Sequence, residues 1–186
     1  IEQPSYPIAE QWFGTHPTAP AQVLDATGGS LADRYGQLGY LVKFLAAANP
    51  LSIQAHPSKQ HAAQQFLNHH PSYSDANHKP ELIIAVTDFR ALCGFRPSDE
   101  LQADLTALAG ANESFVGLAD VFGLGGYQPA MQWIYESKPE LILTLVAHAS
   151  VLGRKRDRLI EQLFQQHGQD LGILVSVLMN LVTLEP

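Results

Sequence analysis

Five polar residues in two short segments have side chains suited to metal binding and proton transfer: Ser52, Gln54, His56, Lys79 and Glu81. The first three alternate with apolar residues along residues 51–56. Alternate side chains of a β-strand point to the same side. We therefore expect a strand here that displays a hydroxyl, an amide oxygen and an imidazole on one face and buries its other face.

The second segment, residues 79–86, also has the pattern of a strand. Pro80 disfavours helix at Lys79 and is tolerated where a strand begins. The residues that follow it, ELIIAV, are rich in β-branched types. Lys79 and Glu81 then share a face, and two neighbouring strands would bring Gln54, His56 and Glu81 together with Lys79 beside them.

Such a set of oxygen and nitrogen donors suits zinc, which accepts histidine nitrogen and carboxylate oxygen. Glutamine is an unusual ligand and adds no charge, so the ion would keep a net positive charge and act as a good Lewis acid. Spacing by itself slightly favours an ordinary surface β-face with scattered polar side chains, because glutamine and histidine occur two residues apart in many strands by chance.

Several blocks of the sequence, in the same order and at similar separations, resemble the type I mannose-6-phosphate isomerases. The blocks are residues 9–17 (AEQWFGTHP), 51–57 (LSIQAHP), 75–81 (DANHKPE), 91–97 (ALCGFRP) and, more loosely after a helical stretch, 181–186 (LVTLEP). A set of blocks in order is far more specific than any one of them. The resemblance covers most of the first half of the chain.

The resemblance implies a fold, a reaction and a site. The fold is α+β, with a partial cupin-like β-barrel or sandwich domain and an inserted all-helical domain. The reaction interconverts mannose 6-phosphate and fructose 6-phosphate. The family binds zinc through Gln, His, Glu and a second His, which makes Gln54, His56 and Glu81 the matching metal ligands. Lys79 matches a substrate-site lysine that is a candidate for catalytic proton transfer, and Ser52 matches a serine that lines the substrate pocket.

Two parts of the family pattern are not found. The family's second histidine ligand and its catalytic arginine lie beyond the segment that resembles residues 184–186, and its opening strand is not seen before Ile1. We therefore expect an internal portion of an isomerase. With three of the four ligands, this chain alone should bind zinc more weakly than the family does and show little isomerase activity.

The chain is expected to divide into a β-domain over residues 1–97, a helical domain over 98–180 and a returning strand over 181–186. Within the first domain we predict strands over 38–48 and 81–86, the latter in a hairpin with 89–95, and a helix from a Ser58 cap to Asn68. Several helices follow Ser98, the first ending at Gly110, with an irregular stretch over 111–126 in which Gly123 and Gly125-Gly126 are the breakers.

Composition limits the possible partners. The net charge of −7 argues against general binding to nucleic acid or anionic membranes, and no apolar run is long enough for a membrane span. A phosphosugar substrate would need local positive charge. The single cysteine, Cys93, cannot form an internal disulfide and favours a reducing cytoplasm. Nothing in the sequence indicates the oligomeric state.

Two questions stay open at this level. Lys79 could act as a base, if nearby positive charge or burial favours its neutral form, or it could stay protonated and bind an anionic oxygen. The alternative to an enzyme is a non-catalytic module that binds a sugar or a metal and docks a partner through its helices.

Overall fold

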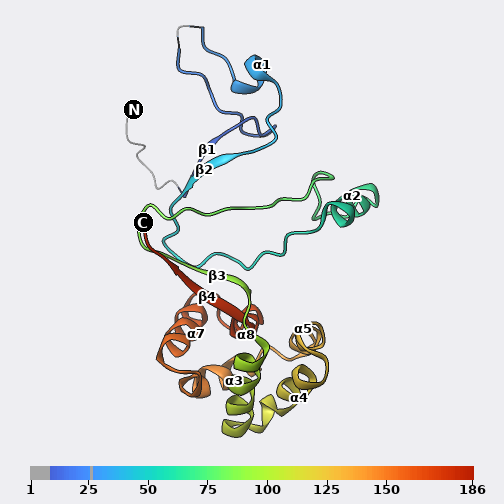
Figure 1. Cartoon of the computed structure of the whole chain (residues 1–186), viewed down its shortest axis with the longest axis vertical. Helices are drawn as coiled ribbons and strands as arrows, with labels where there is room; N and C mark the ends of the chain where they lie inside the picture. Colours follow the sequence, from blue (N-terminus) through green and yellow to red (C-terminus); the bar gives the residue numbers. More distant parts are fainter. Residues whose placement is uncertain (1–8, 26) are drawn as a thin grey trace. The chain divides into compact units, whose positions relative to one another are not determined.

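A computed structural model describes residues 9–25 and 27–186 of the chain. The chain separates into two compact units, Ile1–Leu51 and Ser52–Pro186, and each is described by itself. Figure 1 labels the helices and strands of both.

The N-terminal unit contains a two-stranded antiparallel sheet and one short helix. Strand β1 (Glu10–Phe13) pairs with β2 (Val42–Leu45), with Glu10 opposite Leu45. β2 lies inside the strand predicted over 38–48 and is shorter than predicted. Helix α1 (Leu31–Tyr35) is capped by Ser30, whose hydroxyl accepts the Asp33 N–H at 3.0 Å while the Asp33 carboxylate accepts the Ser30 N–H, forming a capping box.

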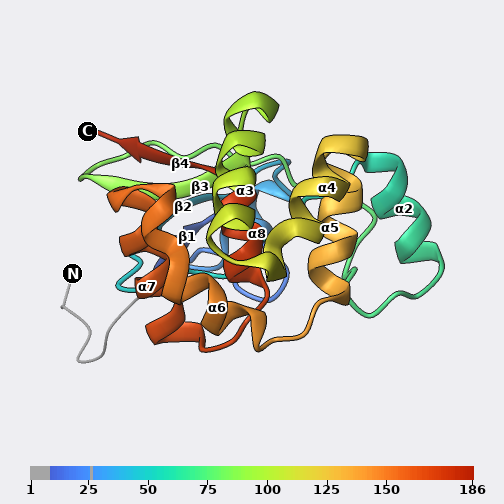
Figure 2. The same cartoon turned by 90° about the horizontal axis from the view of Figure 1, so that it is seen from below.

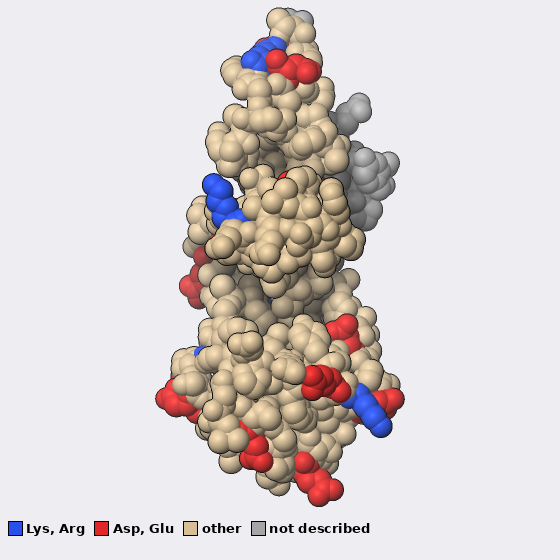
Figure 3. All heavy atoms as spheres, turned by 90° about the vertical axis from the view of Figure 1, so that its right-hand side faces the viewer, with Lys and Arg blue, Asp and Glu red and all other residues tan. Residues whose placement is uncertain are grey.

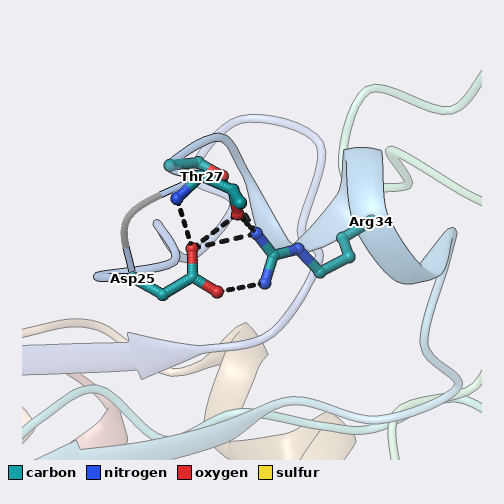
Figure 4. Close-up of polar contacts among 4 residues, drawn as sticks. Asp25, Thr27 and Arg34 are labelled. Atoms are coloured by element: carbon teal, nitrogen blue, oxygen red, sulfur yellow. Dashed lines mark hydrogen bonds and ion pairs between the residues drawn. The ribbon is translucent and has the colours of Figure 1, made fainter.

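An ion pair closes the loop before α1. The Asp25 carboxylate accepts bonds from both terminal nitrogens of Arg34, at 2.5 and 3.1 Å, and from the Thr27 N–H at 3.0 Å (Figure 4). Arg34 also contacts the Thr27 hydroxyl. The Arg34 bonds, followed by those from Thr27, hold the pKa of Asp25 well below its ordinary value. This bidentate pairing fixes the loop to the helix that follows it.

The Asp25 ion pair should therefore be sensitive to acid. A carboxylate with a lowered folded-state pKa adds stability above its unfolded pKa of about 3.9, and that stability is lost as the pH falls through the lower folded value. We expect a carbon-detected NMR titration of the Asp25 carboxyl to give a midpoint below about 3.9, and Arg34→Lys to move it upward because lysine cannot form the two parallel bonds. An unperturbed midpoint would show that the pair does not form in solution.

The second unit contains the remaining elements. They are helices α2 (Lys59–Leu67), α3 (Ser98–Ala111), α4 (Val116–Gly125), α5 (Tyr127–Glu136), α6 (Leu141–His148), α7 (Arg154–His167) and α8 (Gly172–Leu178), the short 3-10 helices η1 (Glu113–Phe115) and η2 (Ala149–Leu152), and strands β3 (Phe89–Phe95) and β4 (Met179–Leu184). No helix of the described residues is long and apolar enough to cross a bilayer.

The hydrophobic core of this unit lies among α3 to α8. On α3 the residues at helical spacing, Leu101, Leu105 and Leu108, are fully buried. They belong to one cluster with Phe115 of η1 and with apolar residues of α4 to α8. Figure 2 shows α3 and α8 near the middle of this helical body, with α7 on one side and α4 and α5 on the other. On the face drawn in Figure 3, acidic side chains are scattered over the helical body rather than gathered in one patch.

The prediction of an irregular stretch over 111–126 was wrong for most of its length, because η1 and α4 occupy it, although α4 does end at the predicted breakers Gly125 and Gly126. Two of the glycines lie inside α4 and make room for neighbours. A Cβ on Gly117 would lie 2.9 Å from the Trp133 indole nitrogen, and one on Gly123 would lie 3.1 Å from the Gln102 amide oxygen. These glycines therefore permit close packing rather than ending a helix. Gly110 likewise does not end α3, which continues to Ala111.

Strand β3 has a different partner from the one predicted. It pairs in antiparallel fashion with β4, Phe89 facing Leu184, and not with residues 81–86. A register shift between Leu92 and Phe95 accompanies Gly94, which has φ of +65°. The helices α3 to α8 thus lie in sequence between two paired strands. β4 runs over Met179–Leu184 and so includes the first four residues of the strand predicted over 181–186.

The two strands predicted over 51–56 and 81–86 do not form. Both segments run through Figure 1 as traces without strand, and within the described residues neither has a ladder of backbone hydrogen bonds. Side chains of the first segment that were expected to be buried are accordingly exposed, among them Leu51 at 60% and Ile53 at 41%. The alternation of side chains was present, but a strand also requires a hydrogen-bonded neighbour.

Two arginines donate to backbone carbonyl oxygens near the end of α8. Arg156 of α7 is half-buried and donates to the carbonyl oxygens of Ser176 at 3.0 Å and Met179 at 2.7 Å, where α8 ends and β4 begins. Burial, together with the nearby Arg96, lowers the pKa of Arg156. Arg96 in turn donates to the Asp104 carboxylate of α3 at 2.7 Å. The Arg156 bonds satisfy carbonyl oxygens at the end of the helix.

Candidate functional site

Two of the predicted metal ligands face each other. His56 lies just before Pro57 and the α2 cap Ser58, whose hydroxyl accepts the His61 N–H at 3.2 Å as predicted. Glu81 follows Pro80, directly after the loop of residues 69–79 that comes after α2. The His56 Nε2 and Glu81 Oε2 atoms are 3.7 Å apart, and both side chains are partly exposed.

A backbone contact sets the orientation of the His56 ring. Its Nδ1 lies against the carbonyl oxygen of Lys79. A carbonyl oxygen can only accept, so Nδ1 must carry the hydrogen. In the neutral ring Nε2 then has the free electron pair, and that is the nitrogen that points to Glu81. Histidines that bind metals are oriented in this way, through a hydrogen bond from the other ring nitrogen.

The geometry of this pair fits a divalent cation. With bonds of about 2.0 to 2.2 Å, two ligands of a tetrahedral zinc are separated by roughly 3.4 Å, close to the 3.7 Å between His56 Nε2 and Glu81 Oε2. The same contact also suits a simple ion pair if the ring is protonated. Within the described residues no third histidine, cysteine, aspartate or glutamate joins the pair. Any further ligand from this part of the chain must be of another kind, such as an amide.

The other predicted site residues are not brought to this pair. Gln54 and Ser52 are exposed, and in the part of the chain that the structure describes neither makes a side-chain hydrogen bond. Lys79 reaches His56 through its backbone carbonyl, while its ammonium lies 3.6 Å from the Asp75 carboxylate. The structure therefore unites His56, Glu81 and the Lys79 backbone and leaves the roles of Gln54, Ser52 and the Lys79 side chain as predictions.

Asp75 is a neighbour of the site that sequence reasoning did not single out. Its Oδ1 accepts the Asn77 N–H at 2.8 Å, and its Oδ2 faces Lys79. The Asn77 bond, followed by the charge of Lys79, lowers the pKa of Asp75. The signal was available, because aspartate two residues before another turn-forming residue often closes a turn with its own side chain.

Comparison with known protein families places this geometry in context. Residues 1–98 match the family described as phosphomannose isomerase type I, catalytic domain. The chain belongs to this family. The match includes each of the five predicted site residues, and it confirms the resemblance inferred from the sequence blocks.

Known phosphomannose isomerases resemble the chain along nearly its whole length. Mannose-6-phosphate isomerase of Homo sapiens is 30% identical over 220 residues, which include 97% of this chain and 52% of that protein. The enzyme of Schizosaccharomyces pombe is 32% identical over 219 residues, covering 98% and 53%. A crystal structure of a phosphomannose isomerase mutant from Salmonella typhimurium has a TM-score of 0.83 at 28% identity, covering 100% of this chain and 55% of that one. The chain spans about half the length of the relatives that it matches.

The structural likeness confirms a mixed helix and sheet fold of the phosphomannose isomerase kind. The described residues form two separate two-stranded sheets and not a closed barrel. The cupin-like character of the β-domain and the boundaries at 97 and 180 stay predictions.

Proposed function

We propose that the protein to which this chain belongs interconverts mannose 6-phosphate and fructose 6-phosphate. The observation that carries the proposal is the family match over residues 1–98, because it spans Ser52, Gln54, His56, Lys79 and Glu81 together. The relatives matched by the chain are named for this activity. Nothing favours the alternative of a non-catalytic binding module.

The proposed site includes a zinc ion held by Gln54, His56 and Glu81. The contact between His56 Nε2 and Glu81 Oε2, with the ring oriented by the Lys79 carbonyl, supports this assignment for two of the three ligands. A bound zinc would supply positive charge near the sugar oxygens. The Glu81 carboxylate and the neutral Nε2 of His56 would hold it, and Gln54 would contribute an uncharged amide oxygen.

The proposed reaction moves one proton between adjacent carbons. In the aldose-to-ketose direction the hydrogen on C2 is transferred to C1 and the hydroxyl proton on O2 is transferred to O1, through an enediol. Negative charge develops on the sugar oxygens, and a nearby cationic group lowers the barrier. Lys79 assists the proton transfer or stabilises that charge, and Ser52 lines the substrate pocket. A cytoplasmic location is part of the proposal, since the exposed thiol of Cys93 suits a reducing compartment.

Replacement of Lys79 by alanine tests this proposal. In the natural full-length protein loaded with zinc, we expect Lys79→Ala to lower kcat for mannose 6-phosphate by about 100-fold or more, as for loss of a general acid or base. A coupled assay for fructose 6-phosphate measures it. The matched control is Lys155→Ala, at an exposed position of α7, which should keep its activity. Unchanged turnover in Lys79→Ala, or no turnover in the wild type with zinc, would refute the proposal.

A further inference from the structure

We propose that Asp75 is a positioning residue for the candidate metal site, holding the turn from which Lys79 presents its carbonyl oxygen to His56. The inference deepens the proposed function and rests on its metal site. It assigns Asp75 an indirect role, through the backbone of Lys79, with no contact to metal or substrate.

The Asp75 carboxylate joins two points of the turn. One oxygen accepts the backbone N–H of Asn77 at 2.8 Å, and the other lies 3.6 Å from the Lys79 ammonium. The hydrogen bond fixes the backbone at Asn77, and the ion pair draws the Lys79 side chain toward Asp75. An exposed ion pair of this kind adds little by itself, so the Asn77 bond is the stronger restraint.

The turn determines what His56 contacts. Residues 76–80 of the described chain belong to no helix or strand, so no ladder of backbone bonds holds the Lys79 carbonyl in place. Pro80 restricts the backbone at Lys79 to extended conformations, and Asp75 fixes the start of the same turn. The Lys79 oxygen can therefore stay at His56 Nδ1. Without this acceptor, the partly exposed ring could bond water and sample both tautomers, and Nε2 would lose its orientation toward Glu81.

The first readout is the His56 tautomer in the metal-free 186-residue chain, measured by long-range nitrogen–proton NMR. We expect the wild type to carry the hydrogen on Nδ1. Asp75→Ala should give a mixture of tautomers at His56. Asp75→Asn should restore most of the wild-type signal, because its amide oxygen can still accept the Asn77 N–H. Asp120→Ala, an exposed change on α4, is the control and should change nothing.

The second readout is zinc affinity by calorimetry. Loss of a partner that orients a metal-bound histidine typically costs 10- to 100-fold, and we expect about tenfold for Asp75→Ala because its effect is indirect. A wild-type tautomer and unchanged affinity in Asp75→Ala would overturn the inference while leaving the metal site intact. If Asp75→Ala changes the His56 tautomer but the wild type binds no zinc, the result would support the positioning role of Asp75 and refute the zinc site. Equal losses in Asp75→Ala and Asp75→Asn would also contradict it, since the Asn77 bond would then not be the cause.

Discussion

Replacing His56 by alanine is expected to weaken zinc binding by more than about 100-fold, beyond the range found when only an orienting partner of a ligand is lost. The reason is that His56 supplies the nitrogen donor that faces Glu81 at 3.7 Å, and the described residues contain no other histidine close enough to that carboxylate to replace it. Calorimetric titration with zinc measures the effect. Isomerase turnover of the zinc-loaded full-length protein should fall in parallel.

The matched control for this change is His167→Ala. His167 lies at the exposed end of α7, so its loss removes an imidazole without touching the site. We expect its zinc affinity to equal that of the wild type, and circular dichroism should show both variants folded. If His56→Ala and His167→Ala bind zinc equally well, His56 is not a ligand.

The second large effect concerns the stability of the helical body. Phe115 is fully buried between the helices, so Phe115→Ala leaves a cavity as well as losing buried area. We expect a loss of about 3 to 5 kcal/mol in the free energy of unfolding, measured by urea denaturation. Val116→Ala, at a neighbouring position that is 43% exposed, should cost much less. Equal effects of the two changes would show that Phe115 is not a core residue.

Local patterns in the sequence predicted local structure well. The helix that begins after Ser58 was predicted from a capping residue and from apolar spacing, and both belong to the residues of the helix itself. The β4 strand was likewise predicted from its own residues. Gly123 was a misleading helix breaker, because it lies inside α4, where a Cβ would lie 3.1 Å from the Gln102 amide oxygen of α3.

Pairing between distant segments could not be predicted. β3 joins β4, which follows it by more than 80 residues, although a nearer segment had an equally good strand pattern. The alternation of polar and apolar residues determines which side chains share a face, but it does not indicate which strand will be the neighbour. Residues 51–56 illustrate the same point. Their alternating side chains predicted a strand, but a strand also requires a neighbouring strand to pair with.

The sequence predicted which residues belong to the candidate site better than it predicted the contacts between them. The alternation of polar residues predicted that His56 and Glu81 lie close together, and in the structure these two side chains face each other. Gln54 was proposed by the same argument, and no contact within the described residues tests it. The contact between the His56 ring and the Lys79 carbonyl involves the backbone, so no choice of side-chain type could have indicated it.

The central claim is that His56 and Glu81 hold one divalent cation between them. Anomalous diffraction at the zinc absorption edge, from crystals of the zinc-loaded protein, tests it most directly. The account predicts a peak within about 2.0 to 2.2 Å of both His56 Nε2 and Glu81 Oε2. A zinc peak elsewhere, with the His56 and Glu81 side chains resolved and free of metal, would contradict it.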